Sequence, residues 1–210
     1  MEMHQIDPMA GIAVMLALAM AGVTQLRSGV TLYGLQSLAV GLLAILTGRS
    51  HHEPWLILVG CAVGLLKGIA VPAYLNYSAR RIGCRTDASL IIAPPLQLFI
   101  ALGGLVLLVL ARPFHTDFSA QSMTAFAVLL LGMQQMLTRR LAISQIIGFL
   151  VIENGIFIFT VVQPHSMPIV VELGVLMDVL AGTMLAGLLA FRINRSFEHI
   201  DVAEMKELRG

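Results

Sequence analysis

The sequence predicts an all-α fold: a polytopic membrane bundle of about seven transmembrane helices, with the N-terminus outside and the C-terminus cytoplasmic. Hydrophobic residues make up 58% of the 210 residues and charged residues only 12%, a composition typical of membrane proteins. Several apolar runs approach about 20 residues, the length a helix needs to cross a hydrocarbon core of about 30 Å. Lys and Arg also concentrate in alternate loops, as the positive-inside rule requires.

Proline and charged residues separate most of the apolar runs and therefore define the ends of the expected helices. The shortest break, 27–28, is marked only by Arg27, Ser28 and the following Gly29. The expected spans are 9–26, 29–48, 54–78, 88–111, 119–137, 143–163 and 168–191. Seven such spans leave no room for a separate soluble domain.

The distribution of basic residues supports both the span count and the orientation. Ten lie in loops assigned to the cytoplasm, against Arg49 and Arg112 on the other side. The ten are Arg27, Arg80, Arg81, Arg85, Arg139, Arg140, Arg192, Arg195, Lys206 and Arg209. Adding or losing one helix would scramble this asymmetry. The first helix is expected to be retained, because no basic residue precedes it as in a signal peptide.

Several activities have no support in the sequence. Two cysteines, Cys61 and Cys84, are too few for an iron–sulfur cluster, and the six histidines fall in loops, ends or tails rather than at haem-binding depth. His51, His52 and Glu53 are adjacent in a loop, which does not place them on one face as a metal site requires. We find no catalytic motif, and a net charge of +1 indicates no nucleic-acid surface. We therefore expect no catalytic residue, cofactor or metal in this chain.

Three ionisable residues interrupt the apolar runs: Lys67, Glu153 and Asp178. Each lies roughly 15–20 Å into its span at about 1.5 Å per residue, close to the bilayer midplane. A charge at this depth costs roughly 2.5–3.5 kcal/mol on insertion scales and usually marks an ion or proton pathway. We therefore expect the three residues to transfer protons. The alternative is a structural role, in which Lys67 pairs with one carboxylate and the other carboxyl group remains protonated.

The surroundings of Lys67 predict close packing and a disturbed helix. Gly60, Gly64 and Gly68 recur every four residues and form a small-residue face that lets another helix approach. Pro72 cannot donate a hydrogen bond to the carbonyl of Gly68, so a kink is expected beside Lys67. Pro94 and Pro95 are expected to bend the fourth span in the same way, with Gln97 as a polar neighbour.

The segment 139–155 (RRLAISQIIGFLVIENG) contains a basic pair, an Ile-Gly step and an intramembrane glutamate. It resembles the second helix of the small K-type (4L) subunit of respiratory complex I. The last expected helix resembles the third helix of that subunit, and the tail 200–210 resembles its ending. This resemblance covers about 119–210 and implies proton-translocating roles for Glu153 and Asp178. The family usually has Glu where this chain has Asp178, whose side chain is one methylene shorter.

The whole chain resembles the E-type membrane subunits of hydrogenase-4 complexes, which are nickel–iron hydrogenases related to complex I and include formate hydrogenlyases. Four additional N-terminal helices, the segment 32–38 (LYGLQSL), Lys67 with Pro72, and the step from Glu153 to Gly155 carry this resemblance. The expected division is a four-helix region, 1–118, followed by a K-type three-helix module with a short cytoplasmic tail, 119–210.

The resemblance implies a non-redox subunit in the bacterial cytoplasmic membrane. Electron transfer would belong to partner subunits, and this chain would couple it to proton movement through Glu153, Asp178 and Lys67. The implied partners are other membrane subunits of the assembly, antiporter-like subunits among them, and the lipid bilayer. Two alternatives stay open: a C-type subunit of a multisubunit sodium/proton antiporter, which generally lacks the four extra helices, and a purely structural membrane adaptor.

Overall fold

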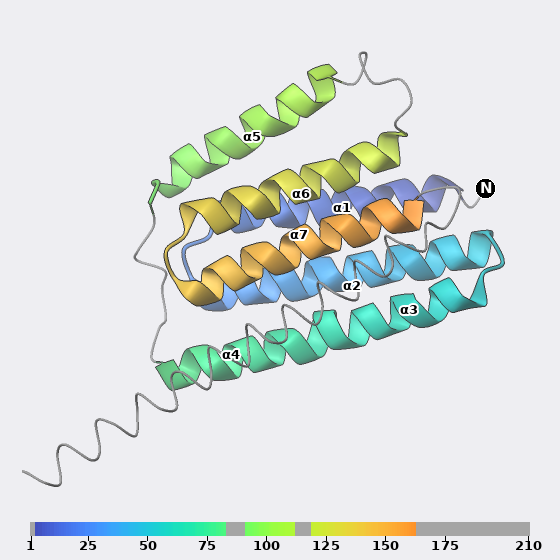
Figure 1. Ribbon diagram of the computed structural model, residues 1–210, viewed down its shortest axis with the longest axis horizontal. Coiled ribbons are helices and arrows are strands. Elements are labelled where there is room, and N and C mark those ends of the chain that lie inside the picture. Colours follow the sequence, from blue (N-terminus) through green and yellow to red (C-terminus); the bar gives the residue numbers. More distant parts are fainter. Residues whose placement is uncertain (1–2, 83–90, 112–118, 163–210) are drawn as a thin grey trace, which may run out of the picture.

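The computed structural model describes residues 3–82, 91–111 and 119–162, and these residues form a bundle of helices that lie side by side (Figure 1). The helices are α1 (Met3–Gly22), α2 (Leu26–Ser50), α3 (Pro54–Leu65), the π-helical turn η1 (Leu66–Ala70), α4 (Val71–Ile82), α5 (Pro94–Ala111), α6 (Ala120–Thr138) and α7 (Ala142–Val162). α3, η1 and α4 follow one another without a break and form one long rod. The described part of the chain is therefore all-α, as predicted.

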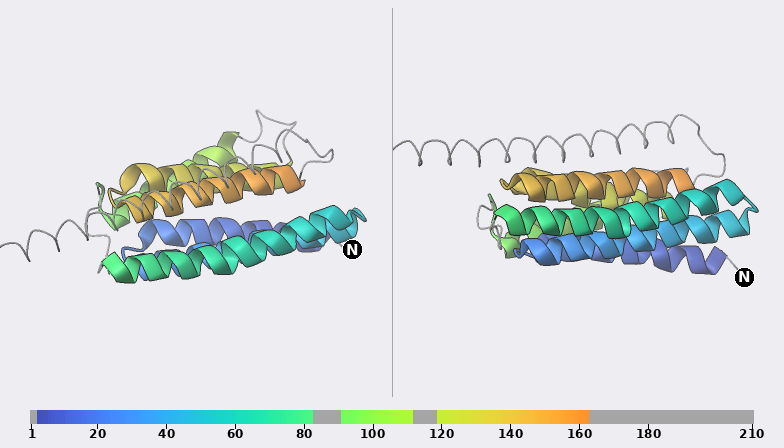
Figure 2. Two further views of the ribbon diagram at one scale, coloured as in Figure 1. Left: turned by 60° about the horizontal axis from the view of Figure 1, so that its bottom comes forward. Right: turned by 90° about the horizontal axis from the view of Figure 1, so that it is seen from below.

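The helices form two layers (Figure 2). One layer contains α1, α2 and the α3–η1–α4 rod, and the other contains α5, α6 and α7. α1 packs against α6 and α2 against α7, so the first two helices of the chain cover the α6–α7 hairpin. The buried core lies between the layers, and Tyr33, Leu43, Ile143 and Ile158 are among its fully buried side chains.

Six of the expected spans correspond to these rods, and the seventh, 168–191, lies outside the described residues. The expected break at 27–28 is wrong. The chain leaves α1 after Gly22, passes through an extended Gln25 and begins α2 at Leu26, so Arg27 lies in the first turn of α2. A long basic side chain is tolerated there because the end of a span lies close to the membrane surface.

The fourth span also begins later than expected, at Pro94 rather than at 88. Pro94 and Pro95 occupy the first turn of α5, where the backbone N–H groups have no partner within the helix and a missing one costs nothing. The expected bend at these prolines is therefore wrong, because they start the helix. Gln97 is buried, and its side-chain amide donates to the carbonyl of Ile92, 2.8 Å away. The main-chain carbonyl of Gln97 accepts a bond from the side chain of Gln134 on α6.

The connection between α2 and α3 is a tight helix-ending turn made by His51, His52 and Glu53. His52 has a positive φ of 58°, and the N–H of Glu53 donates to the carbonyl of Gly48 at 2.8 Å. A second bond, from the His52 N–H to the Arg49 carbonyl, completes the pattern of a Schellman C-cap. The three polar residues therefore serve as a connector, as the sequence indicated.

Glycines bring neighbouring helices of each layer into backbone contact. A Cβ added at Gly41 of α2 would lie 2.8 Å from the carbonyl oxygen of Gly60 and 3.0 Å from the nitrogen of Gly64, both on α3. In the other layer, a Cβ at Gly148 of α7 would lie 2.8 Å from the nitrogen of Met136 on α6. Only glycine permits these approaches, which confirms the predicted packing role of the α3 glycines.

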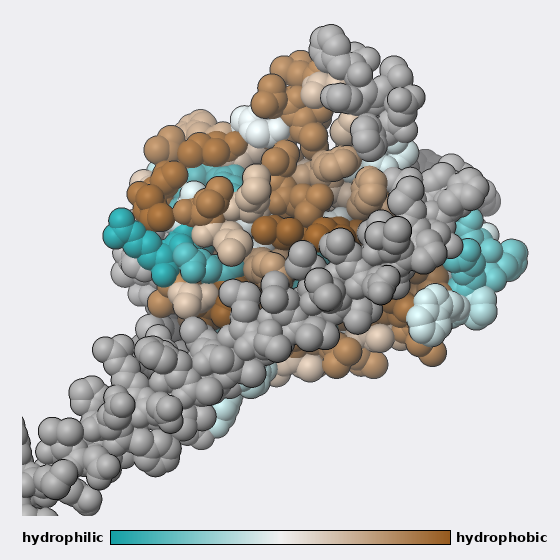
Figure 3. All heavy atoms as spheres, viewed as in Figure 1, coloured by the Kyte–Doolittle hydropathy of each residue, from teal (hydrophilic) through white to brown (hydrophobic). Residues whose placement is uncertain are grey.

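On the face seen in Figure 3, the described residues are mostly apolar over the middle, and hydrophilic residues gather at the two ends. Four helical segments are long and apolar enough to cross a membrane: Leu26–Ser50, Pro54–Arg80, Pro94–Ala111 and Ala142–Val162. α5 is the clearest case, since Phe99 is 72% exposed and Leu107 68% exposed. Such a surface is stable against lipid or a membrane partner and not against water. The chain is therefore a helical membrane protein.

Candidate functional site

The ion pair between Lys67 and Glu153 is the centre of the candidate site. The Nζ of Lys67 lies 3.2 Å from Oε1 of Glu153, although the residues come from η1 in one layer and α7 in the other. Their side chains are 7% and 2% exposed, respectively. The sequence placed these two residues at similar depth, and the structure brings them into contact. Asp178, the third predicted residue, lies outside the described residues.

The π turn η1 presents Lys67. Pro72 has no N–H to donate to the carbonyl of Gly68, and the N–H of Val71 instead donates to Leu66, five residues back. A kink was predicted beside Lys67, and the structure has a π turn at this place, between α3 and α4 of one continuous rod. π turns inside α-helices are rare and occur frequently at functional sites.

α2 supports the π turn through glycine packing. A Cβ added at Gly34 would lie 3.0 Å from both the carbonyl oxygen of Gly68 and the Cγ of Pro72. One at Gly68 would lie 2.7 Å from the Cγ of Leu38. Gly34 and Gly68 therefore let α2 and the Lys67 turn approach as closely as their backbones permit.

A second set of buried polar groups joins α7 to α2 and α2 to α1. Asn154, which follows Glu153 on α7, donates its Nδ2 to Ser37 Oγ at 2.9 Å and to Gln36 Oε1 at 3.4 Å, both on α2. Gln36 in turn donates to the carbonyl of Ala13 on α1 at 3.0 Å. Gln36 and Ser37 belong to the segment 32–38, and Asn154 belongs to the segment 139–155. The sequence indicated an individual role for none of the three. Their only sequence signal was a neutral polar residue within an apolar run.

The arrangement places a carboxylate and an ammonium group 3.2 Å apart in the buried interior, close enough for direct proton exchange. Burying either charge alone is expensive, and pairing them offsets much of that cost. Such a pair can hold, accept or release a proton when a neighbouring charge or helix changes position. Among the described residues, no group of three or more His, Cys, Asp and Glu side chains is placed to hold a metal ion.

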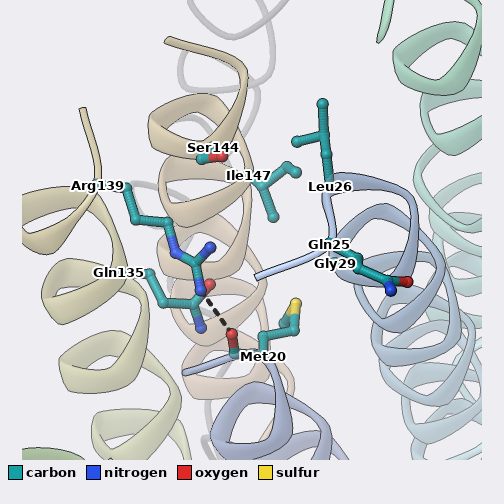
Figure 4. Close-up of a pocket in the computed structure, with 8 residues that line it drawn as sticks. All are labelled: Met20, Gln25, Leu26, Gly29, Gln135, Arg139, Ser144 and Ile147. Carbon is teal, nitrogen blue, oxygen red and sulfur yellow. Dashed lines mark hydrogen bonds between the residues drawn. The ribbon is translucent and has the colours of Figure 1, made fainter. Parts of the chain in front are cut away.

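Arg139 joins the two layers at the end of the bundle where α1 meets α2 and α6 meets α7 (Figure 4). Its guanidinium donates to the carbonyls of Met20 at 2.9 Å and Val23 at 2.8 Å. Met20 lies in the last turn of α1, where carbonyls lack the usual partner four residues on, and Val23 directly follows the helix. The sequence predicted a loop charge that orients the chain, whereas the structure shows Arg139 7% exposed and capping α1.

A small cavity adjoins this contact. It measures about 10 Å³, and Gln135, Arg139, Ser144 and Gln25 supply its polar lining. That volume suffices for about one water molecule. Gln135 also donates to the carbonyl of Ala17 at 3.1 Å, so this end of the bundle is held by polar bonds from α6 to α1.

Comparison with known proteins gives full-length similarities. Hydrogenase-4 component E of Escherichia coli strain K12 is 26% identical over 211 residues, which cover 98% of this chain and 97% of that protein, and the Shigella flexneri protein matches equally. The uncharacterized protein Rv0085 of Mycobacterium tuberculosis is 31% identical over 215 residues, covering 97% of this chain and 96% of that one. The chain belongs to the hydrogenase-4 component E family. The resemblance to the E-type subunits of hydrogenase-4 complexes is thereby confirmed.

No family model and no solved structure matches this member of the component E family. The similarity spans both layers, including the N-terminal helices that antiporter C-type subunits generally lack. The comparisons therefore favour the hydrogenase interpretation over the antiporter alternative.

Proposed function

We propose that this chain is a membrane-arm subunit of a hydrogenase-4 or formate hydrogenlyase-type complex, in which Glu153, Asp178 and Lys67 take part in proton translocation. Electron transfer would take place in partner subunits that carry the nickel–iron and iron–sulfur centres. The family membership supports the first part of this proposal. The Lys67–Glu153 pair is the single observation that supports the second.

The proposed mechanism uses the ion pair as a proton-loading site. A conformational or electrostatic change that arrives from neighbouring subunits would weaken the contact between Lys67 and Glu153. Glu153 would then take up a proton, because an unpaired carboxylate is strongly disfavoured in a dry interior. Restoring the contact would release the proton laterally toward Asp178 in the helix expected at 168–191. Lys67 acts either as a relay member or as the counter-charge that drives this release.

The proposed location is the bacterial cytoplasmic membrane, with seven spans, the N-terminus outside and the C-terminus in the cytoplasm. Arg27, Arg80, Arg139 and Arg140 lie at the same end of the bundle, and Arg49 lies at the other. That asymmetry supports the proposed orientation. We propose that the chain divides into a four-helix region, 1–118, and a K-type module, 119–210.

Co-purification tests the proposed assembly. The chain, tagged and extracted in mild detergent, should carry with it subunits that contain nickel and iron–sulfur clusters, together with antiporter-like membrane subunits. Metal analysis and mass spectrometry of the purified complex would identify them. Recovery with antiporter subunits alone, without a hydrogenase large subunit, would contradict the proposal.

Replacement of Asp178 tests the lateral route. In a complex that still assembles and evolves hydrogen at the wild-type rate, Asp178→Asn should lower the number of protons translocated per hydrogen formed, since the amide cannot accept the proton. Asp178→Glu, which restores the residue usual in the related K-type subunit, should retain translocation. Full translocation by Asp178→Asn would remove Asp178 from the route.

A further inference from the structure

Asn154 occupies an unusual place, because it is the residue after Glu153 and is fully buried, with an exposed fraction of 0%. A buried amide is unfavourable unless it is hydrogen-bonded. Its Nδ2 group donates to Ser37 and Gln36 of α2, in the opposite layer, whereas its Oδ1 has no hydrogen-bond partner among the described residues. The bond from Asn154 therefore crosses between the layers directly beside the ion pair.

Ser37 stands on the turn of α2 that also supports Lys67. Gly34, three residues before Ser37, packs against the carbonyl of Gly68 and against Pro72. Leu38, the next residue, packs against Gly68, which itself follows Lys67. One turn of α2 thus contacts both helices that contribute to the pair: the Lys67 turn through Gly34 and Leu38, and α7 through Ser37.

We propose that Asn154 is a positioning residue whose bond to Ser37 sets the orientation and depth of Glu153 toward Lys67. Consecutive residues of an α-helix differ by about 100° in direction and about 1.5 Å in height. Fixing Asn154 against Ser37 therefore fixes where Glu153 points. The inference rests on the proposed function, because the positioning matters for proton transfer only if Glu153 carries the proton.

Gln36 extends the same support to α1. Its amide accepts from Asn154 and donates to the carbonyl of Ala13, so α1, α2 and α7 share one chain of hydrogen bonds. The chain runs across the bundle at the level of the ion pair. A shift of α7 against α2 would strain these bonds and the Lys67–Glu153 contact together.

The test uses the assembled complex in membrane vesicles with three variants. Asn154→Leu removes the donor and keeps the same branching of side-chain heavy atoms, and Ser37→Ala removes only the acceptor oxygen. Gln135→Met is the matched control, because Gln135 is also buried and makes the same kind of bond between layers, to Ala17, nearer the α6–α7 turn. Each variant is compared with the wild type for hydrogen evolution, for protons translocated per hydrogen, and for pH-induced infrared difference spectra. The infrared band that disappears in the Glu153→Gln variant is assigned to the Glu153 carboxyl group.

We expect Asn154→Leu and Ser37→Ala to shift the Glu153 infrared band and to lower proton translocation several-fold, with hydrogen evolution retained. Gln135→Met should leave the band and translocation unchanged. An unshifted band in Asn154→Leu would overturn the inference, as would an equal shift in Gln135→Met, since the bond would then be general support between layers. If Asn154→Leu fails to assemble, Ser37→Ala carries the same test.

The two proposals fail in different ways. Unchanged proton translocation in Glu153→Gln would rule out the proposed proton transfer through Glu153, whatever the result for Asn154. The infrared band would still show whether Asn154 sets the surroundings of Glu153. If Glu153→Gln loses translocation but the Glu153 band is unchanged in Asn154→Leu and Ser37→Ala, only the positioning role of Asn154 is ruled out.

Discussion

A contribution of the Lys67–Glu153 pair to stability can be separated from its proposed role in proton transfer. Removing one member of a buried ion pair leaves an uncompensated charge, whereas replacing both with apolar residues is often neutral or stabilising. A structural adaptor needs only the packing that an apolar pair would also supply. A proton-transfer site needs the ionisable groups themselves.

The double variant should therefore separate these two interpretations. Lys67→Met and Glu153→Met should each lower the free energy of unfolding by about 3–5 kcal/mol. The double variant should recover most of that loss, because no charge is then left alone. Reversible unfolding in detergent measures the three values. We expect the double variant to be stable and assembled but unable to translocate protons. A stable, assembled double variant that still translocates protons would show that the pair is only structural.

Lys67 and Glu153 could be singled out from the sequence because a charge within an apolar run is conspicuous. Lys67 and Glu153 were selected by depth, and the structure joins them. The neutral groups Asn154 and Ser37 were missed, because such residues are common in membrane helices and their spacing does not say which neighbour they face. The burial of Arg139 depends on a contact with α1, far away in sequence, and could not be predicted locally.

At the scale of helices, packing depends on where glycines meet. Gly41 faces the backbone of α3 at distances that no side chain can occupy, whereas Gly103 of α5 has no atom within 4 Å of an added Cβ. The two residues have the same chemistry in the same kind of helix. Their surroundings alone should decide the effect of adding a methyl group.

Alanine substitutions test this contrast. Gly41→Ala should destabilise the protein by about 1–3 kcal/mol, because α2 and α3 must separate to accept the methyl group. Gly103→Ala should be neutral or stabilise by up to about 1 kcal/mol, since alanine is the better helix former. Thermal unfolding midpoints of the purified proteins measure both changes. Equal midpoints for the two variants would show that the α2–α3 contact is looser than described.

Hydropathy predicted the helices better than it predicted their ends. Length and apolar content identified the described spans, because both follow directly from the thickness of the bilayer. The α1–α2 break was misplaced by a few residues, since capping by Arg139 decides where α1 stops. Pro72 indicated a disturbed helix, but its form as a π turn depends on packing against Gly34, which local sequence does not reveal.

The whole molecule is organised as two layers that differ in how they are held. Within the layers, glycines bring α2 to α3 and α6 to α7 in backbone contact. Between the layers, the polar bonds from Gln135 and Arg139 lie at one end of the bundle, and the bond from Asn154 lies next to the Lys67–Glu153 pair. Polar bonds between helices can exchange partners more readily than interlocked backbones can move. The boundary between the layers is thus suited to transmit a change to the ion pair.

The orientation of the bundle can be tested at its two ends. His52→Cys and Arg140→Cys place thiols at exposed positions on opposite ends, in a background where Cys61 and Cys84 are replaced by serine. A membrane-impermeant maleimide should label the first variant in intact spheroplasts and the second only after permeabilisation. The reverse pattern would invert the proposed topology, and labelling of both from one side would contradict a spanning bundle.

The ratio of protons translocated to hydrogen formed, measured in vesicles that contain the assembled complex with Glu153→Gln, tests the central claim most directly. Glu53→Gln is the control, because Glu53 is an exposed carboxylate in the α2–α3 turn. We predict that Glu153→Gln evolves hydrogen with a much reduced ratio, while Glu53→Gln keeps the wild-type ratio. A wild-type ratio in an assembled, hydrogen-evolving Glu153→Gln complex would contradict the account.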